Sequence, residues 1–305
     1  MLSMSSNNQP LHLSFAIPSS FVDIYPNRTQ QTQQIGRIAR AAAIFQVSDI
    51  LVYQDANNAT QRKNSQLISR VLEYMETPQY LRKHLFGKLH ELRFVGLLPP
   101  LRTPHHPLAK HARNLKNGEI REGFAYQDKQ KIVVDIGVEE PLLLMEKHPK
   151  KLPTRITVRI HRTGNGRLVA QPCTPPDPSI YWGYKTRQIQ QPLTDFLQKS
   201  SSYKLIIAAT RKGELVDNQV TSLRRAWQKA GHLLILFGSH EEGLDTIFRR
   251  MGHDLSSITK YQVNFLAHQG VATIRVDEAI LIGLTIFRFI ERASHSGRNL
   301  TRSNE

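Results

Sequence analysis

The sequence predicts an α/β protein in which a parallel sheet is interrupted by a small β-barrel. Short, wholly apolar segments typical of buried parallel strands alternate with helical patterns in both end regions of the chain. Between these regions, short strand-like segments follow one another without helices, which is typical of a small barrel or meander. Two proline-rich segments, 96–108 and 172–179, flank this middle part. We therefore expect one discontinuous α/β domain, residues 1–95 and 180–305, and a β insert at 96–179.

The N-terminal region has the pattern of two strand–helix pairs. Residues 11–17 alternate as a strand does, and residues 28–47 have the apolar period of a helix. Residues 49–55 predict a second, buried strand, and 65–86 predict a helix or a helix pair broken at Pro78.

The insert and the C-terminal region complete the series of elements. Strand-like segments of the insert lie at 122–137, 140–145, 155–162 and 166–172. The elements predicted after residue 180 are a buried strand at 203–210, a helix at 222–230 ended by Gly231, a buried strand at 232–239, a short helix at 243–252, a strand-like piece at 263–267 and a long helix at 276–293.

The segment “HQGVATIR”, residues 268–275, has no helical period and is too apolar for an ordinary exposed loop. It predicts a buried, irregular segment just before the last helix. A buried loop needs partners for its backbone N–H and C=O groups. A ligand that binds through those backbone groups would supply them.

The charge of the chain favours a polyanionic partner. Lys and Arg number 41 against 25 Asp and Glu, for a formal charge of +16. Nucleic acid is the first candidate and an anionic membrane surface the second, although a merely basic protein would show the same excess. The single cysteine, Cys173, excludes an intrachain disulfide and argues against a cysteine-based metal site. The chain shows no signal peptide and no apolar run of roughly 20 residues, so we expect a soluble cytoplasmic protein.

Six segments, taken together, resemble a known family. “IGRIARAAAIFQVSDILVY”, “LLILFGSHEEGL” and “NFLAHQGVATIRVDEAI” resemble the three motifs of SPOUT-class RNA methyltransferases. “GLLPPLRTPHH”, “REGFA” and “YWGYKTR” resemble the archaeal and eukaryotic branch whose SPOUT domain carries an OB-like insertion. The resemblance implies a SPOUT-type parallel sheet with a C-terminal trefoil knot, interrupted by an OB-like β-barrel.

The resemblance also implies a cofactor and partners. S-adenosylmethionine (SAM) would be held in a bent shape by the knotted segment 265–275, the substrate would be RNA, and two copies would form a homodimer. No metal is implied. The residues that would bind the cofactor are Thr210, Phe237, Gly238, Asn264, Leu266, Gln269, Gly270, Thr273 and Ile274. Gly238 follows a buried strand, where ligands of α/β sheets bind, and lets a ligand approach the backbone; an ordinary strand-to-helix turn would look the same.

Catalytic candidates follow from the same motifs. Arg40 matches the arginine of the first motif and would orient the target phosphate or base at the dimer interface. The alternative is an internal salt bridge, because an unpaired buried arginine is costly. Glu241 and Glu242 compete for the glutamate of the second motif, and His240 has no assigned role. Methyl transfer to a ring nitrogen such as uridine N3 needs a general base, for which these two glutamates and Asp277 are candidates, although helix capping alone explains Asp277.

Basic residues predict where RNA binds. Nine of them are interleaved with Phe124 and Tyr126 in the insert, a pattern that suits single-stranded RNA, although a solvated basic face would look similar. The candidates are Lys131, Arg159 and Arg162 in the insert, and Arg28, Arg37 and Arg211 outside it; the other basic residues of the insert are Lys129, Lys147, Lys150, Lys151, Arg155 and Arg167.

The adjacent His105 and His106 look like a metal pair. On an extended segment their side chains would point to opposite faces, so we expect packing or RNA contact instead of a metal site.

Three functions stay open on the sequence alone. The first is a SAM-dependent RNA methyltransferase acting on a base, such as uridine, of rRNA or tRNA. The second is a non-catalytic RNA-binding or ribosome-assembly factor that retains the SPOUT fold and would bind RNA but not SAM. The third, a protein methyltransferase, would leave the basic surface unexplained and would bind RNA weakly, with little dependence on salt.

Overall fold

The computed structural model describes residues 11–145, 149, 151–175 and 180–296. The chain divides into two compact units. The first unit comprises Met1–Leu72, Phe94–Leu98 and Tyr184–Glu305, and the second comprises Glu73–Arg93 and Pro99–Gly183. The units differ from the predicted ranges chiefly because residues 73–93 belong with the insert. There, the Tyr80 hydroxyl donates to the backbone oxygen of Glu122 at 2.7 Å.

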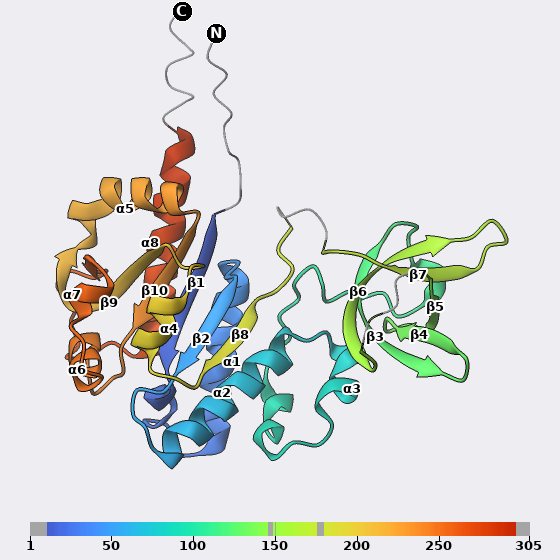
Figure 1. Cartoon of the computed structure of the whole chain (residues 1–305), viewed down its shortest axis with the longest axis horizontal. Coiled ribbons are helices and arrows are strands. Elements are labelled where there is room, and N and C mark those ends of the chain that lie inside the picture. The colour runs from blue at the N-terminus through green and yellow to red at the C-terminus, as the bar shows by residue number, and fades with distance from the viewer. Residues whose placement is uncertain (1–10, 146–148, 150, 176–179, 297–305) are drawn as a thin grey trace, which may run out of the picture. The chain divides into compact units, whose positions relative to one another are not determined.

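The first unit contains a parallel sheet of six strands in the order β11-β9-β10-β1-β2-β8 (Figure 1). The central strand β1 pairs with β10 on one side and with β2 on the other, and Phe15 lies opposite both Ile235 and Ile50. Strands from both ends of the chain therefore form one core. The strands are β1 (His12–Pro18), β2 (Asp49–Tyr53), β8 (Lys185–Ile189), β9 (Leu205–Leu215), β10 (His232–Phe237) and β11 (Tyr261–Asn264).

Helices cover both faces of this sheet (Figure 1). One apolar cluster includes residues of α4, α6 and α7 together with Ala16, Leu51 and Leu234 of the strands. Elsewhere, Trp227 and Phe287 meet edge to face and join α5 to α8. The helices of this unit are α1 (Arg28–Ile44), α2 (Ala59–Glu76, whose last turn belongs to the second unit), α4 (Leu193–Lys199), α5 (Val216–Ala230), α6 (Leu244–Arg250), α7 (Leu255–Ile258) and α8 (Val276–Ser296), with 3-10 turns η1 (Ser19–Val22) and η4 (Val95–Leu97).

The second unit is built on a closed barrel in the order β3-β4-β5-β7-β6. Its interior is filled by fully buried apolar side chains, among them Ala125, Val134, Val158 and Ile160. The elements are β3 (Ile120–Asp128), β4 (Lys131–Asp135), β5 (Leu142–Leu144), β6 (Thr154–Arg162), β7 (Leu168–Pro172), α3 (Arg82–Phe86), η2 (Gln79–Leu81), η3 (His90–Leu92) and η5 (Ala112–Asn114).

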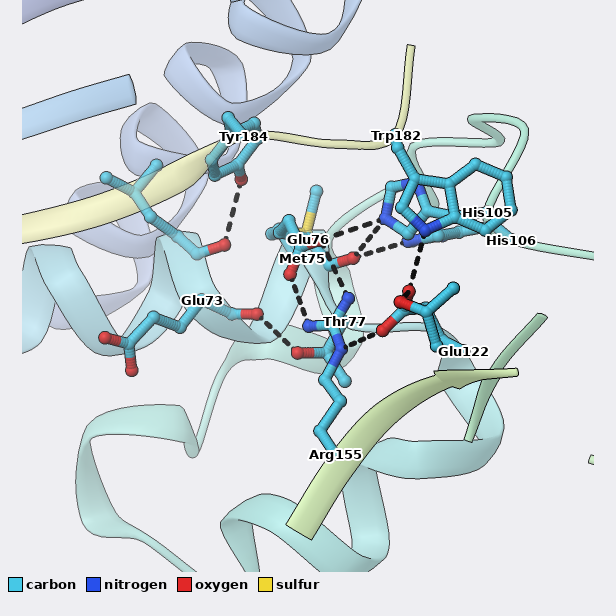
Figure 2. A network of polar contacts seen from close by, with 12 residues as sticks. Glu73, Met75, Glu76, Thr77, His105, His106, Glu122, Arg155, Trp182 and Tyr184 are labelled. Atoms are coloured by element: carbon cyan, nitrogen blue, oxygen red, sulfur yellow. Dashed lines mark hydrogen bonds and ion pairs between the residues drawn. The ribbon is translucent and has the colours of Figure 1, made fainter. Parts of the chain in front are cut away.

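A buried polar network in the second unit joins segments that are far apart in the sequence (Figure 2). The Glu76 carboxylate accepts from both terminal nitrogens of Arg155, at 2.6 and 3.0 Å. Nε of Arg155 donates to Glu122 at 2.7 Å, and the other oxygen of Glu122 accepts from Trp182 Nε1 at 2.7 Å. His105 Nε2 also lies 3.1 Å from the Glu76 carboxylate. Three of the sequence motifs therefore meet here: “GLLPPLRTPHH” through His105, “REGFA” through Glu122 and “YWGYKTR” through Trp182.

The predicted orientation of the two adjacent histidines is wrong. His105 and His106 both direct Nε2 at the backbone oxygen of Glu76, at 2.9 and 2.6 Å, so their rings lie on the same side. The reason is a turn, closed by the His106 N–H donating to the Thr103 carbonyl at 2.8 Å, where an extended segment was expected. Packing, as expected, accounts for His105, which is fully buried.

The parallel sheet and the barrel insert are confirmed, and the knot stays a prediction of the family likeness. The sequence analysis missed β8, α4 and the short helix α7. No helix among the described residues is long and apolar enough to cross a membrane.

Candidate cofactor and active site

A cavity of about 300 Å³ lies in the first unit, at the carboxyl ends of β9, β10 and β11. Parallel sheets of α/β proteins bind their ligands at this edge. Of the residues predicted to bind the cofactor, only Gly270 does not line the cavity; the others, Thr210, Phe237, Gly238, Asn264, Leu266, Gln269, Thr273 and Ile274, all do. The structure thus brings together residues from three segments that are distant in the sequence.

An irregularity in the pairing of β9 with β11 forms one wall. The register moves from Gln262 opposite Ala208 to Val263 opposite Glu214, so the intervening β9 residues have no partner in β11. Thr210 and Arg211 belong to this bulge and line the cavity. Glycine is required at 213, because a Cβ there would lie 2.5 Å from the backbone of Gln262.

The turn after β10 forms a second wall. The Ser239 N–H donates to the Glu242 carbonyl at 3.0 Å, and the Glu242 N–H donates to Ser239 Oγ at 2.9 Å. A Cβ on Gly238 would lie 3.0 Å from backbone atoms of Glu242 and Leu244, a close approach that favours glycine here. The buried Tyr53 hydroxyl donates to the Phe237 carbonyl at 2.6 Å and fixes the end of the strand.

The loop between β11 and α8 forms the third wall. Gln269 Nε2 donates to the carbonyls of Val271 and Ala272, at 2.8 and 3.1 Å, and Arg211 also donates to Ala272, at 3.0 Å. The segment is irregular, as predicted, but the prediction that it is buried is wrong, since Val271 is 59% exposed. Side chains donate to several backbone carbonyls of this loop, so these groups do not need a bound ligand as their hydrogen-bond partner.

The two glutamates predicted to be catalytic occupy different environments. Glu241 lines the cavity, and its side chain is 79% exposed. Glu242 does not line the cavity; Arg250 Nη1 donates to both of its oxygens, at 2.7 and 2.6 Å. Arg250 also donates to the Asp55 carbonyl, so the Glu242 carboxylate is held by an arginine that also contacts the end of another segment.

The remaining acidic candidate lies at the start of α8. Asp277 is buried, accepts from the Tyr25 hydroxyl at 3.4 Å and lies 3.9 Å from Arg37. Burial and the neighbouring Asp277 raise the pKa of Tyr25 to about 12. Glu278 accepts from the Arg275 N–H at 2.9 Å and so caps the start of α8. Neither acidic residue lines the cavity.

The predicted arginines and lysine are spread over the chain. Arg28, Arg37 and Arg40 lie on α1, outside the cavity lining, whereas Arg211 lines the cavity and donates to the loop between β11 and α8. Lys131, Arg159 and Arg162 are exposed on the barrel. Lys147 and Lys150 lie outside the described residues.

Sequence reasoning did not predict several polar residues of the cavity, among them Lys212, Ser239 and Thr246. His240 and Asp245 both line it, from the turn and from the first turn of α6. Their position just after Gly238 was the available signal. The described residues hold no group of three or more His, Cys, Asp or Glu side chains that could bind a metal ion.

The lining is chemically mixed. Phe237, Phe265, Ile274 and Ile282 provide an apolar wall, while Asn264 and backbone groups of the three segments provide polar contacts. Such a site suits a small molecule that combines an aromatic ring with charged groups, such as a nucleoside joined to an amino acid.

Comparison with known proteins assigns the family. Residues 12–287 match the family described as “Putative RNA methyltransferase”. The chain belongs to this family. This match confirms the resemblance to RNA methyltransferases that the sequence motifs indicated.

Three individual proteins are similar to this chain over most of its length. The mouse 28S rRNA (uridine-N(3))-methyltransferase is 30% identical, over 92% of this chain and 77% of that protein. The human protein of the same name is 31% identical, over 90% of this chain and 77% of its own length. An uncharacterized protein of the archaeon Haloarcula marismortui is 27% identical, over 91% of this chain and 99% of its own.

Proposed function

We propose that this protein is a SAM-dependent methyltransferase that modifies N3 of a uridine in large-subunit rRNA. The observation that carries the proposal is the cavity at the carboxyl ends of β9, β10 and β11, lined by the residues that the SPOUT motifs mark for the cofactor. Uridine N3 is proposed because relatives at 30% and 31% identity carry that activity in their names.

The cavity residues fit SAM. Apolar side chains would enclose the adenine, and Asn264, Gln269 and the backbone of the three walls would receive its polar groups. Bound SAM supplies an activated methyl group, so the protein must place the acceptor nitrogen, at about 3 Å, and exclude water. Knotting of the loop 265–275 would fix this pocket and is part of the proposal.

A homodimer is the second part of the proposal. Helix α8 carries Leu281 and Phe289, eight residues apart on one face, with exposures of 42% and 69%. Ile44, at the end of α1, is 59% exposed, and Arg288 ties α8 to this end through the Phe45 carbonyl. A second copy covering this face would also bring Arg40 of α1 to the interface, where we propose that it orients the target.

Exposed groups of the barrel support RNA binding by the insert. Three basic side chains of the barrel are exposed, those of Lys131, Arg159 and Arg162. The ring centroids of Phe124 and Tyr126 lie 6.1 Å apart on one face of β3. Backbone neutralisation and base stacking are how small barrels hold single strands. One face of Phe124 is covered by the ring of His84, which stacks at 4.7 Å. Tyr126 is therefore the better placed ring for a base.

Titration calorimetry with SAM tests the cofactor site. Ala279 lines the cavity from α8, so Ala279→Phe should fill it and weaken SAM binding by more than about tenfold, or 1.4 kcal/mol. The matched control is Ala59→Phe, at an exposed position at the start of α2, which should bind as the wild type does. If the wild-type protein does not bind SAM, the methyltransferase proposal fails and the RNA-binding factor takes its place.

A further inference from the structure

A second cavity, of about 410 Å³, lies on the barrel of the second unit. Three arginines line it: Arg113 from η5, Arg162 at the end of β6 and Arg167 just before β7. All three are exposed. Arg113 is not part of any sequence motif, and the fold brings it to the same cavity as the two arginines of the β6–β7 turn.

The side chains of these arginines are largely unused. Within the described part of the chain, Arg113 and Arg167 make no side-chain hydrogen bond or ion pair. Arg162 Nη1 donates to the Gly166 carbonyl at 3.1 Å, which leaves most of its five N–H donors free. Three cations around one cavity repel one another, and the walls of a cleft concentrate their field. An anion in the cavity would offset this repulsion and accept the free N–H groups.

The two glutamates of the lining do not neutralise the arginines. Both oxygens of Glu139 are occupied, one by His111 Nδ1 at 2.7 Å and the other by the Ala112 N–H at 2.8 Å. Glu139 therefore holds η5 in place. The other glutamate, Glu140, is exposed. Three arginines against two glutamates leave an excess of positive charge around the cavity.

The turn between β6 and β7 is held in shape by its own hydrogen bonds. The Thr163 N–H donates to the Arg167 carbonyl at 2.9 Å, and the Gly166 N–H donates to the Thr163 carbonyl at 2.8 Å. Gly166 has a φ of +82°, which glycine adopts without strain. Arg162 and Arg167 are thus carried on a backbone that is ordered before any ligand binds, and this lowers the entropic cost of binding.

The remaining lining residues indicate the kind of anion. Leu143 and Leu168 are half-buried and line the same cavity, together with Pro141. A phosphodiester of a nucleic acid joins an anionic group to the apolar surfaces of a sugar and a base, whereas a free phosphate has no apolar part. The planar fork of an arginine also matches two oxygens of one phosphate.

We propose that this cavity binds a backbone phosphate of single-stranded RNA. Arg113, Arg162 and Arg167 donate to the non-bridging phosphate oxygens, and Leu143 and Leu168 contact the adjoining sugar or base. The inference rests on the proposed function, which makes RNA the substrate, and it adds a defined phosphate site at one end of the barrel. Phosphate contacts carry no sequence information but fix position and orientation, so this site orients the strand.

The test is the fluorescence anisotropy of a labelled single-stranded RNA over a series of salt concentrations. Arg113→Gln combined with Arg167→Gln should weaken binding about tenfold at low salt. It should also reduce the slope of log K against log salt by about 0.7 for each phosphate contact that is lost. Arg113→Lys combined with Arg167→Lys keeps the charge but loses the fork, so it should still weaken binding about threefold.

The matched control is Lys83→Gln combined with Lys88→Gln. These lysines are exposed in the same unit, outside the cavity lining, and the change removes the same charge as the first variant. The control should weaken binding less than about twofold, because both lysines act only through the general field.

Three results would overturn the inference. The first is a lysine double variant that binds RNA as the wild type does, and the second is equal weakening in the arginine-to-glutamine variant and the control. The third is inorganic phosphate that binds the wild type but not the glutamine variant while RNA binds both equally, which would assign the cavity to free phosphate. A wild type that does not bind SAM would instead overturn the proposed methyltransferase, whatever the RNA measurements show.

Discussion

The carboxylate of Glu76 stays ionised although it is buried. Burial alone would raise its pKa, but hydrogen bonds from His105 and Arg155, and the charge of Arg155, lower the pKa to about 2. Nearby, burial and then His105 lower the pKa of His106 to about 4. Both groups therefore bind a proton less readily in the folded than in the unfolded chain, and acid should destabilise the second unit.

Acid unfolding of the second unit should occur in two windows. The free energy of unfolding should fall as pH drops from 6.5 to about 4, where unfolded but not folded His106 is protonated. It should fall again from 4.5 to about 2, where Glu76 behaves in the same way. Each of these pKa differences between the unfolded and the folded chain corresponds to roughly 3 kcal/mol in the free energy of unfolding. His106→Gln should remove the upper window, and Glu76→Gln should shrink the lower one, to which Glu122, whose pKa is also lowered, contributes as well.

Urea unfolding at a series of pH values measures this effect. Trp182 reports on the second unit when Trp227, the other tryptophan, is replaced by Phe in every variant compared. The control Glu140→Gln, an exposed carboxylate of the same unit, should keep both windows. Unfolding free energies that do not change between pH 6.5 and 2 would show that the network carries no such linkage.

At the level of elements, the sequence predicted the segments that have a clear hydrophobic pattern and missed segments that lack one. Strands β1, β2 and β10 are mostly apolar and were predicted within about two residues. Strand β8, “KTRQI”, lies at the edge of the sheet, and its polar residues hide it from a hydrophobic pattern. The motifs predicted residues that the structure brings together around one cavity, but the engagement of Glu242 by Arg250 could not be foreseen, because it depends on side-chain geometry at a turn.

The exposed apolar face of helix α8 is predicted to form the dimer interface. Leu281→Asp combined with Phe289→Asp places two charges on its exposed apolar face, so it should convert a dimer into a monomer. Sedimentation equilibrium of the wild type and the variant measures the effect. Leu108→Asp, which changes a leucine that is 81% exposed in the second unit, should leave the dimer intact. A wild type that sediments as a monomer at micromolar concentration would contradict the proposed dimer.

For the whole molecule, the net charge of +16 predicts the class of partner but not the surface to which that partner binds. The sequence placed RNA binding on the insert by composition, and Lys131, Arg159 and Arg162 are indeed exposed there. Composition cannot distinguish such a site from a general attraction between a basic protein and a polyanion. The sequence alone also cannot predict the knot, because a hydrophobic pattern carries no information on which loop a segment passes through.

Salt dependence makes that distinction. Changing Lys131, Arg159 and Arg162 to Gln should weaken binding of a single-stranded RNA at low salt. It should also reduce the slope of log K against log salt by about 0.7 for each phosphate that the variant no longer neutralises. The control changes Lys199, Lys204 and Lys229 of the first unit to Gln; these lysines are exposed, and the change removes the same charge. Equal weakening in both triple variants would show that net charge alone attracts the RNA. Weakening confined to the insert variant, with SAM binding unchanged in both, would locate the RNA on the barrel, because only local interactions distinguish two proteins of equal charge.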